Sequence, residues 1–108
     1  TLILAHLGNS DNGHMSRQVR AIQRARADNV YTDTSSIRSM SSGLIEWAVA
    51  QIGYDHILFG TDTPLYFTAA QKARVEYAEI EDAAKRAILF DNAARLLHTK
   101  IPETMARL

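Results

Sequence analysis

Three short runs of apolar and β-branched residues divide the sequence into units of about 25 to 30 residues, close to the size of a strand followed by a helix. The runs occupy residues 1–7, 30–34 and 57–60. Each ends in turn-forming or small polar residues, and apolar residues at helical spacing follow. Strands that alternate with helices pair in parallel through right-handed crossovers. The sequence therefore predicts an α/β fold with flanking helices, whose polar residues gather at the carboxyl ends of the strands.

The segments between these runs carry helix signals. Ser16 is a suitable N-cap, Gly53 a suitable stop, and Thr68 has the capping-box spacing with Gln71 three residues on. Asn92 is expected to cap the last helix, and Tyr77, like Trp47, is expected to pack as a helix aromatic. The predicted helices cover approximately residues 17–27, 44–52, 69–80, 82–90 and 92–97.

Composition excludes several classes of protein. The 108 residues hold 12 basic and 12 acidic side chains, which argues against a nucleic-acid or anionic-membrane partner. No apolar run approaches the ~20 residues of a membrane helix, so we expect a cytoplasmic protein. The chain has no cysteine, which leaves His, Asp and Glu as possible metal ligands.

Two polar residues stand at predicted strand ends. Strand alternation puts His6 on the face of Leu4 and Asp62 on the face of Gly60. Each has an ordinary structural explanation when taken singly. His6 can be a buried imidazole satisfied by backbone, and Asp62 can be a turn former before Pro64. Because both fall at one edge of a parallel sheet, we treat them together as a candidate site.

Four ordered segments resemble the amidohydrolase-related metal-dependent hydrolases, in the branch that includes aminocarboxymuconate-semialdehyde decarboxylase-like enzymes. They are AHLG at 5–8, NVYTDTS at 29–35, ILFGTDTP at 57–64 and DNAARLL at 91–97. The family fold is a (β/α)8 barrel, which takes about 250 residues. The resemblance implies that residues 1–108 are a partial barrel. Strands six, seven and eight would be residues 1–6, 29–34 and 56–62, and closing helices would follow.

The resemblance also implies roles for two side chains. Asp62 would be a metal ligand that handles the proton of the metal-bound water. His6 would be a catalytic or substrate-polarising residue, and a second-metal ligand in binuclear relatives. The implied cofactor is a divalent metal, zinc by preference.

The family's remaining ligands, a His-X-His pair on strand one and a His on strand five, have no counterpart in these residues. His14, His56 and His98 do not replace them, because they lie in or beside a loop, before strand eight and after the last helix. A catalytic zinc ion usually has three protein ligands, so we expect the 108 residues alone to bind metal weakly and to be inactive.

The implied reaction of the whole enzyme is metal-assisted hydrolysis, or non-oxidative decarboxylation, of a small carboxylated or lactone-like substrate. The alternative is a non-catalytic β/α module that forms a homo-oligomer, or that associates with the remaining barrel, through the strand edge at residues 1–7. A doubly wound protein with a phosphate site at residues 8–13 is a poorer hypothesis, because that stretch lacks a glycine-rich nucleotide fingerprint.

Other polar residues have simpler explanations. Asp33 is expected to bond the turn at residues 34–35, although it could point into the barrel mouth. Arg38 is expected to be a solvated loop residue, with binding of a substrate carboxylate as the alternative. Asn9, Asp11 and Asn12 match a calcium loop in composition only and are expected to form a plain turn.

Overall fold

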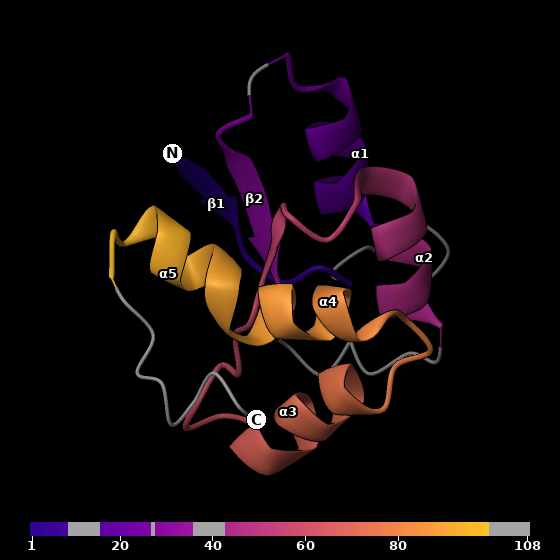
Figure 1. Ribbon diagram of the computed structural model, residues 1–108, viewed down its shortest axis with the longest axis vertical. Helices are drawn as coiled ribbons and strands as arrows, with labels where there is room; N and C mark the ends of the chain where they lie inside the picture. The colour runs from indigo at the N-terminus through magenta and orange to yellow at the C-terminus, as the bar shows by residue number, and fades with distance from the viewer. Residues whose placement is uncertain (9–15, 27, 36–42, 100–108) are drawn as a thin grey trace.

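Three short strands alternate with helices in a computed structural model that describes residues 1–8, 16–26, 28–35 and 43–99. The sheet order is β1-β2-β3, and both pairings are parallel. The predicted α/β fold with parallel strands and flanking helices is therefore confirmed. The elements are β1 (Leu2–Leu4), α1 (Arg17–Arg24), β2 (Val30–Asp33), α2 (Leu44–Ile52), β3 (Ile57–Leu58), α3 (Thr68–Glu76), α4 (Asp82–Arg86), the π-helical turn η2 (Ala87–Asp91) and α5 (Asn92–Leu96) (Figure 1).

The central strand β2 is tied to both neighbours by side chains as well as by backbone. The Thr32 hydroxyl donates to the Leu4 carbonyl oxygen at 2.8 Å, and the Thr34 hydroxyl donates to the Gly60 carbonyl oxygen at 3.0 Å. Both threonines are fully buried. The three strands therefore end at a common edge, which we call the carboxyl edge.

The strand ladders are shorter than the sequence predicts at this edge. β1 ends at Leu4 and β3 at Leu58, whereas the predicted strands continue to His6 and Asp62. Both residues have left-handed backbone, with φ of 67° at His6 and 61° at Asp62. A left-handed residue does not continue the pleat, so the predicted assignment of His6 and Asp62 to faces by strand alternation is wrong.

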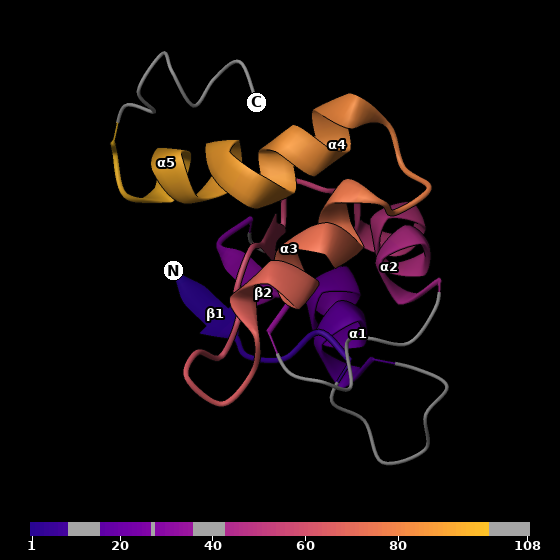
Figure 2. The same cartoon turned by 90° about the horizontal axis from the view of Figure 1, so that it is seen from below.

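Helices lie on two sides of the sheet. α1 and α2 lie side by side on one flank, and α4, η2 and α5 form a rod that passes along β3 (Figures 1 and 2). α3 lies beyond the carboxyl edge (Figure 1). Among the described residues, no helix is long and apolar enough to cross a membrane. The core comprises Leu7, Val19, Ile45, Ala48, Ile57, Val75, Ala78 and Ile88.

Two of the predicted helix signals act as expected. The Ser16 hydroxyl accepts from the Val19 amide at 3.2 Å, and Gly53 ends α2 with φ of 72°. The predicted capping box at Thr68 is wrong, because Thr68 is already helical and its hydroxyl bonds the Thr63 hydroxyl at 2.5 Å. Tyr77 does not pack either, since 86% of its surface is exposed.

Asn92 does not cap a helix. The backbone is helical on both sides of the predicted start, so α4, η2 and α5 continue without a break. The Asn92 side chain is fully buried, and its Nδ2 donates to the Tyr54 carbonyl at 2.7 Å and the Ile57 carbonyl at 2.8 Å. Asn92 therefore attaches the closing helix to the amino end of β3.

Candidate active site at the carboxyl edge

A hydrogen-bonded cluster joins the ends of β1 and β2. The Asp33 Oδ1 atom accepts from the His6 backbone amide at 3.2 Å and from the Ser35 backbone amide at 2.9 Å. The Ser35 hydroxyl also donates to this oxygen, and the same hydroxyl lies 2.9 Å from His6 Nδ1. Asp33 thus bonds the turn at residues 34–35, as the sequence predicts, and in addition holds His6. We call His6, Asp33 and Ser35 the edge cluster.

β3 approaches the edge cluster through Gly60. A methyl group on Gly60 would lie 3.1 Å from Asp33 Cγ and 3.2 Å from Ser35 Cβ, which is closer than ordinary van der Waals contact. The Gly60 amide donates to the Thr34 hydroxyl at 3.1 Å. Glycine therefore lets the chain after β3 lie this close to the cluster, whereas a side chain would require Asp33 and Ser35 to shift by a few tenths of an ångström.

Asp62 follows two residues after Gly60, so its Cα lies within about 7 Å of the Gly60 Cα. Its backbone carbonyl accepts from the Leu65 amide at 2.9 Å. Within the part of the chain that the structure describes, its half-buried carboxylate has no hydrogen-bond or ion-pair partner. Asp62 therefore forms a turn, as its ordinary explanation requires, and still keeps its carboxylate available.

Helix α3 also contributes a side chain to the carboxyl edge. Arg74 Nη1 donates to the Thr34 carbonyl oxygen at 3.3 Å and to Gln71 Oε1 at 3.0 Å. Burial lowers the pKa of Arg74 from its ordinary value, and the nearby Glu46 carboxylate partly opposes that shift. Sequence reasoning missed this residue. The spacing of three residues places Gln71 and Arg74 on one face of the helix, but it does not indicate which strand that face contacts.

The remaining candidates do not join the cluster. His56 lies before β3, where its Nδ1 is 2.9 Å from the Val30 carbonyl oxygen, and His98 is exposed after α5. His14, Arg38, Asn9, Asp11 and Asn12 lie outside the described residues. Across residues 1–8, 16–26, 28–35 and 43–99, no group of three or more His, Cys, Asp or Glu side chains could hold a metal ion. His6 and Asp62, the two ligands that the resemblance implies, both follow strands at the carboxyl edge.

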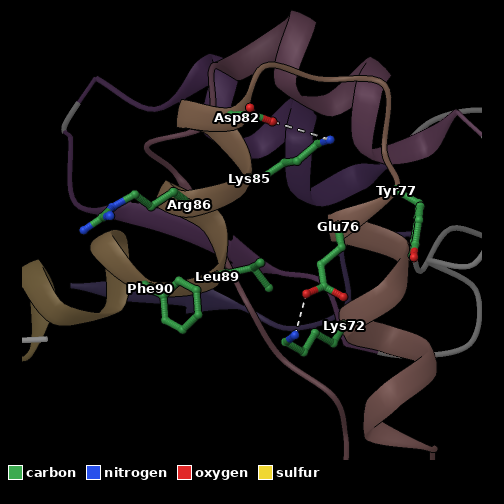
Figure 3. Close-up of a pocket in the computed structure, with 8 residues that line it drawn as sticks. All are labelled: Lys72, Glu76, Tyr77, Asp82, Lys85, Arg86, Leu89 and Phe90. Atoms are coloured by element: carbon green, nitrogen blue, oxygen red, sulfur yellow. Dashed lines mark hydrogen bonds and ion pairs between the residues drawn. The ribbon is translucent and has the colours of Figure 1, made fainter. Parts of the chain in front are cut away.

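A hollow of about 540 Å³ lies away from the edge cluster, between α3 and the helical segment formed by α4 and η2. Figure 3 shows Lys72 turned toward Glu76 and Lys85 turned toward Asp82, each pair on its own helix. Because these cations already face carboxylates, the hollow lacks the convergent polar groups that the edge cluster has.

The three β/α units, with polar side chains at the carboxyl ends of their strands, have the architecture of part of a TIM barrel. The family model described as amidohydrolase matches residues 1–99. The chain therefore belongs to the amidohydrolase family, and the resemblance drawn from its four sequence segments is confirmed. A comparison with functionally curated proteins finds no match.

Three solved decarboxylases share the fold. The dihydroxybenzoic acid decarboxylase from Polaromonas sp., solved with bound manganese and the inhibitor 2-nitroresorcinol, has a TM-score of 0.67 at 23% identity over 95% of this chain and 35% of its own. The 2,6-dihydroxybenzoate decarboxylase from Rhizobium has a TM-score of 0.66 at 22% identity, over 89% of this chain and 34% of the Rhizobium chain. The 5-carboxyvanillate decarboxylase from Sphingomonas paucimobilis has a TM-score of 0.60 at 21% identity, over 67% of this chain and 21% of its own length. The chain thus spans between a fifth and about a third of these relatives.

Proposed function

We propose that this chain supplies part of the active site of a metal-dependent enzyme that decarboxylates a small hydroxylated aromatic acid. One observation carries the proposal: His6 and Asp62 both follow strands at the carboxyl edge, and both have left-handed backbone. For residues other than glycine this conformation costs on the order of 1 kcal/mol and is concentrated at functional sites. Two such residues at one edge of a β/α sheet support a shared chemical role.

The donor atoms fit a divalent metal in kind, although they are too few to enclose one. Asp62 offers a carboxylate and His6 an imidazole nitrogen, which are ligand types that zinc accepts. Further ligands must come from outside the described residues. Zinc remains our proposal for the ion, with manganese as the alternative because the Polaromonas relative was solved with it. A bound divalent ion supplies Lewis-acid polarisation of a substrate oxygen.

Decarboxylation breaks the bond between the ring carbon and the carboxylate, releases CO2 and leaves the electron pair on carbon, which then takes up a proton. In this proposal the Asp62 carboxyl group holds that proton, and His6 orients the reacting oxygen. Hydrolysis uses the same two groups in a related way, with Asp62 accepting a proton from water. We place decarboxylation first because the three solved relatives carry decarboxylase names.

The test uses Asp62→Ala and His6→Asn in the native polypeptide, with bound metal measured by elemental analysis and CO2 release measured on a panel of hydroxybenzoates. We expect both variants to lose at least ~100-fold in turnover, and Asp62→Ala also to lose metal. His98→Asn is the matched control, because His98 also has positive φ but is exposed after α5. Unchanged metal content and turnover in Asp62→Ala would contradict the proposal.

A second candidate function, association through a strand edge, is favoured by β1. This strand pairs only with β2 in the described sheet, and Leu2 and Ile3 are 55% and 50% exposed. A strand with one unpaired edge and exposed apolar side chains favours pairing with another strand, from a second copy or from further barrel units. We expect the mass of the 108-residue chain in solution to exceed that of a monomer, and Ile3→Lys to restore the monomer. A stable monomer before substitution would count against this candidate.

A further inference from the structure

The hydrogen bonds of the edge cluster determine which nitrogen of the His6 ring carries the proton. We propose that Ser35 and Asp33 are positioning residues that fix the tautomer of His6, with the proton on Nδ1 and the lone pair on Nε2. For a neutral imidazole, the tautomer follows from these hydrogen bonds. Its use in metal binding or catalysis rests on the proposed function of His6.

The direction of each bond follows from the capacity of its atoms. An ionised carboxylate only accepts, and a serine hydroxyl carries one hydrogen. That hydrogen points to Asp33 Oδ1, so the Ser35 oxygen meets His6 Nδ1 with a lone pair. The ring nitrogen at 2.9 Å must then be the donor. A neutral imidazole carries one N–H, so Nε2 is left as the acceptor.

The cluster holds its members from several sides. Ser35 is 6% exposed, and its backbone amide and hydroxyl both bond Asp33. The Leu7 amide donates to the Asp33 carbonyl oxygen at 2.8 Å, next to the bond from the His6 amide to Asp33 Oδ1. Gly60 lies close to both Asp33 and Ser35. The His6 backbone is therefore bonded to Asp33, the last residue of β2, and its ring to Ser35, two residues further on.

The tautomer determines what His6 can do. With the lone pair on Nε2, the ring can bind a divalent ion or accept a proton, whereas the opposite tautomer offers only an N–H there. Groups that hold the second nitrogen of a metal-binding histidine typically change metal affinity 10–100-fold. Asp33 and Ser35 would thus act on the reaction without touching the substrate.

His56 provides an internal control. Its Nδ1 lies 2.9 Å from the Val30 carbonyl oxygen, which can only accept, so His56 also carries its proton on Nδ1. This bond is independent of Ser35 and Asp33. A change that moves the His6 tautomer and leaves His56 unaltered therefore identifies the edge cluster as the cause.

The experiment records ¹⁵N shifts of the histidine rings in the metal-free native polypeptide at about pH 8, where an ordinary imidazole is neutral. We expect His6 to carry its proton on Nδ1. In Ser35→Ala the ring should shift toward the Nε2–H form that water favours. Ser35→Thr keeps the hydroxyl and should restore the wild-type pattern. A proton on Nε2 in the wild type, or identical spectra in Ser35→Ala, would overturn the proposal.

A titration of the same variants with Mn²⁺ and Zn²⁺ separates this proposal from the proposed function. We expect metal affinity to fall about 10–100-fold in Ser35→Ala and to recover in Ser35→Thr. If the tautomer changes as expected while metal affinity and turnover do not, the tautomer assignment stands and the metal-binding role of His6 is overturned. A folded variant is recognised by unchanged His56 signals.

Discussion

The two ends of the sheet use polar side chains differently. At the amino end, Asn92 and His56 bond backbone carbonyl oxygens of β3 and β2. At the carboxyl edge, His6, Ser35 and Asp33 bond one another. Asp62 keeps a carboxylate without a partner among the described residues. The number of polar groups therefore does not distinguish the two ends, but the kind of partner does.

The difference teaches how a structural histidine is told from a candidate catalytic one. In β/α barrels, chemistry lies at the carboxyl ends of strands, and the amino ends mainly contribute stability. His56 and His6 both have Nδ1 bonded, yet His56 is held by a backbone carbonyl, whereas His6 is held by a side-chain pair that substitution can alter. Changes at the amino end should thus act on stability, and changes at the carboxyl edge on chemistry.

The largest effect on stability is expected for Asn92→Ala. The change removes the hydrogen bonds to both carbonyls and leaves the buried Ile57 carbonyl without this donor, whereas the Tyr54 carbonyl keeps the Ile57 amide at 3.2 Å, so we expect a loss of about 2–4 kcal/mol in the free energy of unfolding. Urea denaturation of the native polypeptide measures it. Turnover per folded molecule should not change. Arg95→Ala is the milder control, since its contacts with Asp55 are exposed; equal losses in both variants would contradict the prediction.

Gly60→Ala is expected to cost about 1–3 kcal/mol, because its methyl group would press on Asp33 and Ser35. Unlike Asn92→Ala, it should also change the ¹⁵N shifts of the His6 ring. Gly43→Ala is the matched control. It strains a residue with φ of 76° but meets nothing within 4 Å, so it should reduce stability without altering His6. Indistinguishable His6 signals in the two variants would show that the edge cluster tolerates the methyl group.

A smaller effect of opposite sign is expected for Asp62→Gly. Glycine adopts left-handed backbone without strain, so the free energy of unfolding should rise by about 0.5–1 kcal/mol while metal binding is lost. Thermal and urea unfolding measure the first quantity and elemental analysis the second. A loss of stability would identify the Asp62 carboxylate as a structural group.

The smallest effect is expected at the hollow of Figure 3, which belongs to neither end of the sheet. Lys72 and Glu76 form an i,i+4 ion pair with both side chains more than 40% exposed. Lys72→Ala should change the free energy of unfolding by less than about 0.5 kcal/mol, less still in high salt, and should leave turnover intact. A larger loss of turnover would show that the hollow takes part in function.

Local signals predicted much of the fold. Ser16 and Gly53 mark helix ends because a cap acts on neighbouring residues, and the apolar runs locate all three strands. The strand ends were not predictable, since left-handed residues at positions 6 and 62 interrupt an otherwise extended pattern. Asn92 was misassigned for a related reason. A buried asparagine that bonds a distant strand has the same sequence appearance as a helix cap.

The sequence predicted residues of the candidate site but not the hydrogen bonds that they form. The residue types and strand positions of His6 and Asp62 suggest chemistry, and the four segments identify the family. The bond between His6 and Ser35 spans 29 residues of sequence, and that between Arg74 and Thr34 spans 40. No local pattern encodes such contacts, because they depend on strand register and helix placement. The role of Ser35 therefore emerged only from the structure.

The central position of β2 has a consequence for the order of folding. Both side-chain bonds that join it to β1 and β3 close long stretches of chain, 28 and 26 residues. Closing such loops costs entropy before any contact compensates, so non-local parallel pairing is slow. Neither outer strand has a partner in the described sheet until β2 is in place. β1 and β3 can therefore join this sheet only by pairing with β2. The edge cluster contains residues that follow both β1 and β2, so it forms only after these two strands have paired.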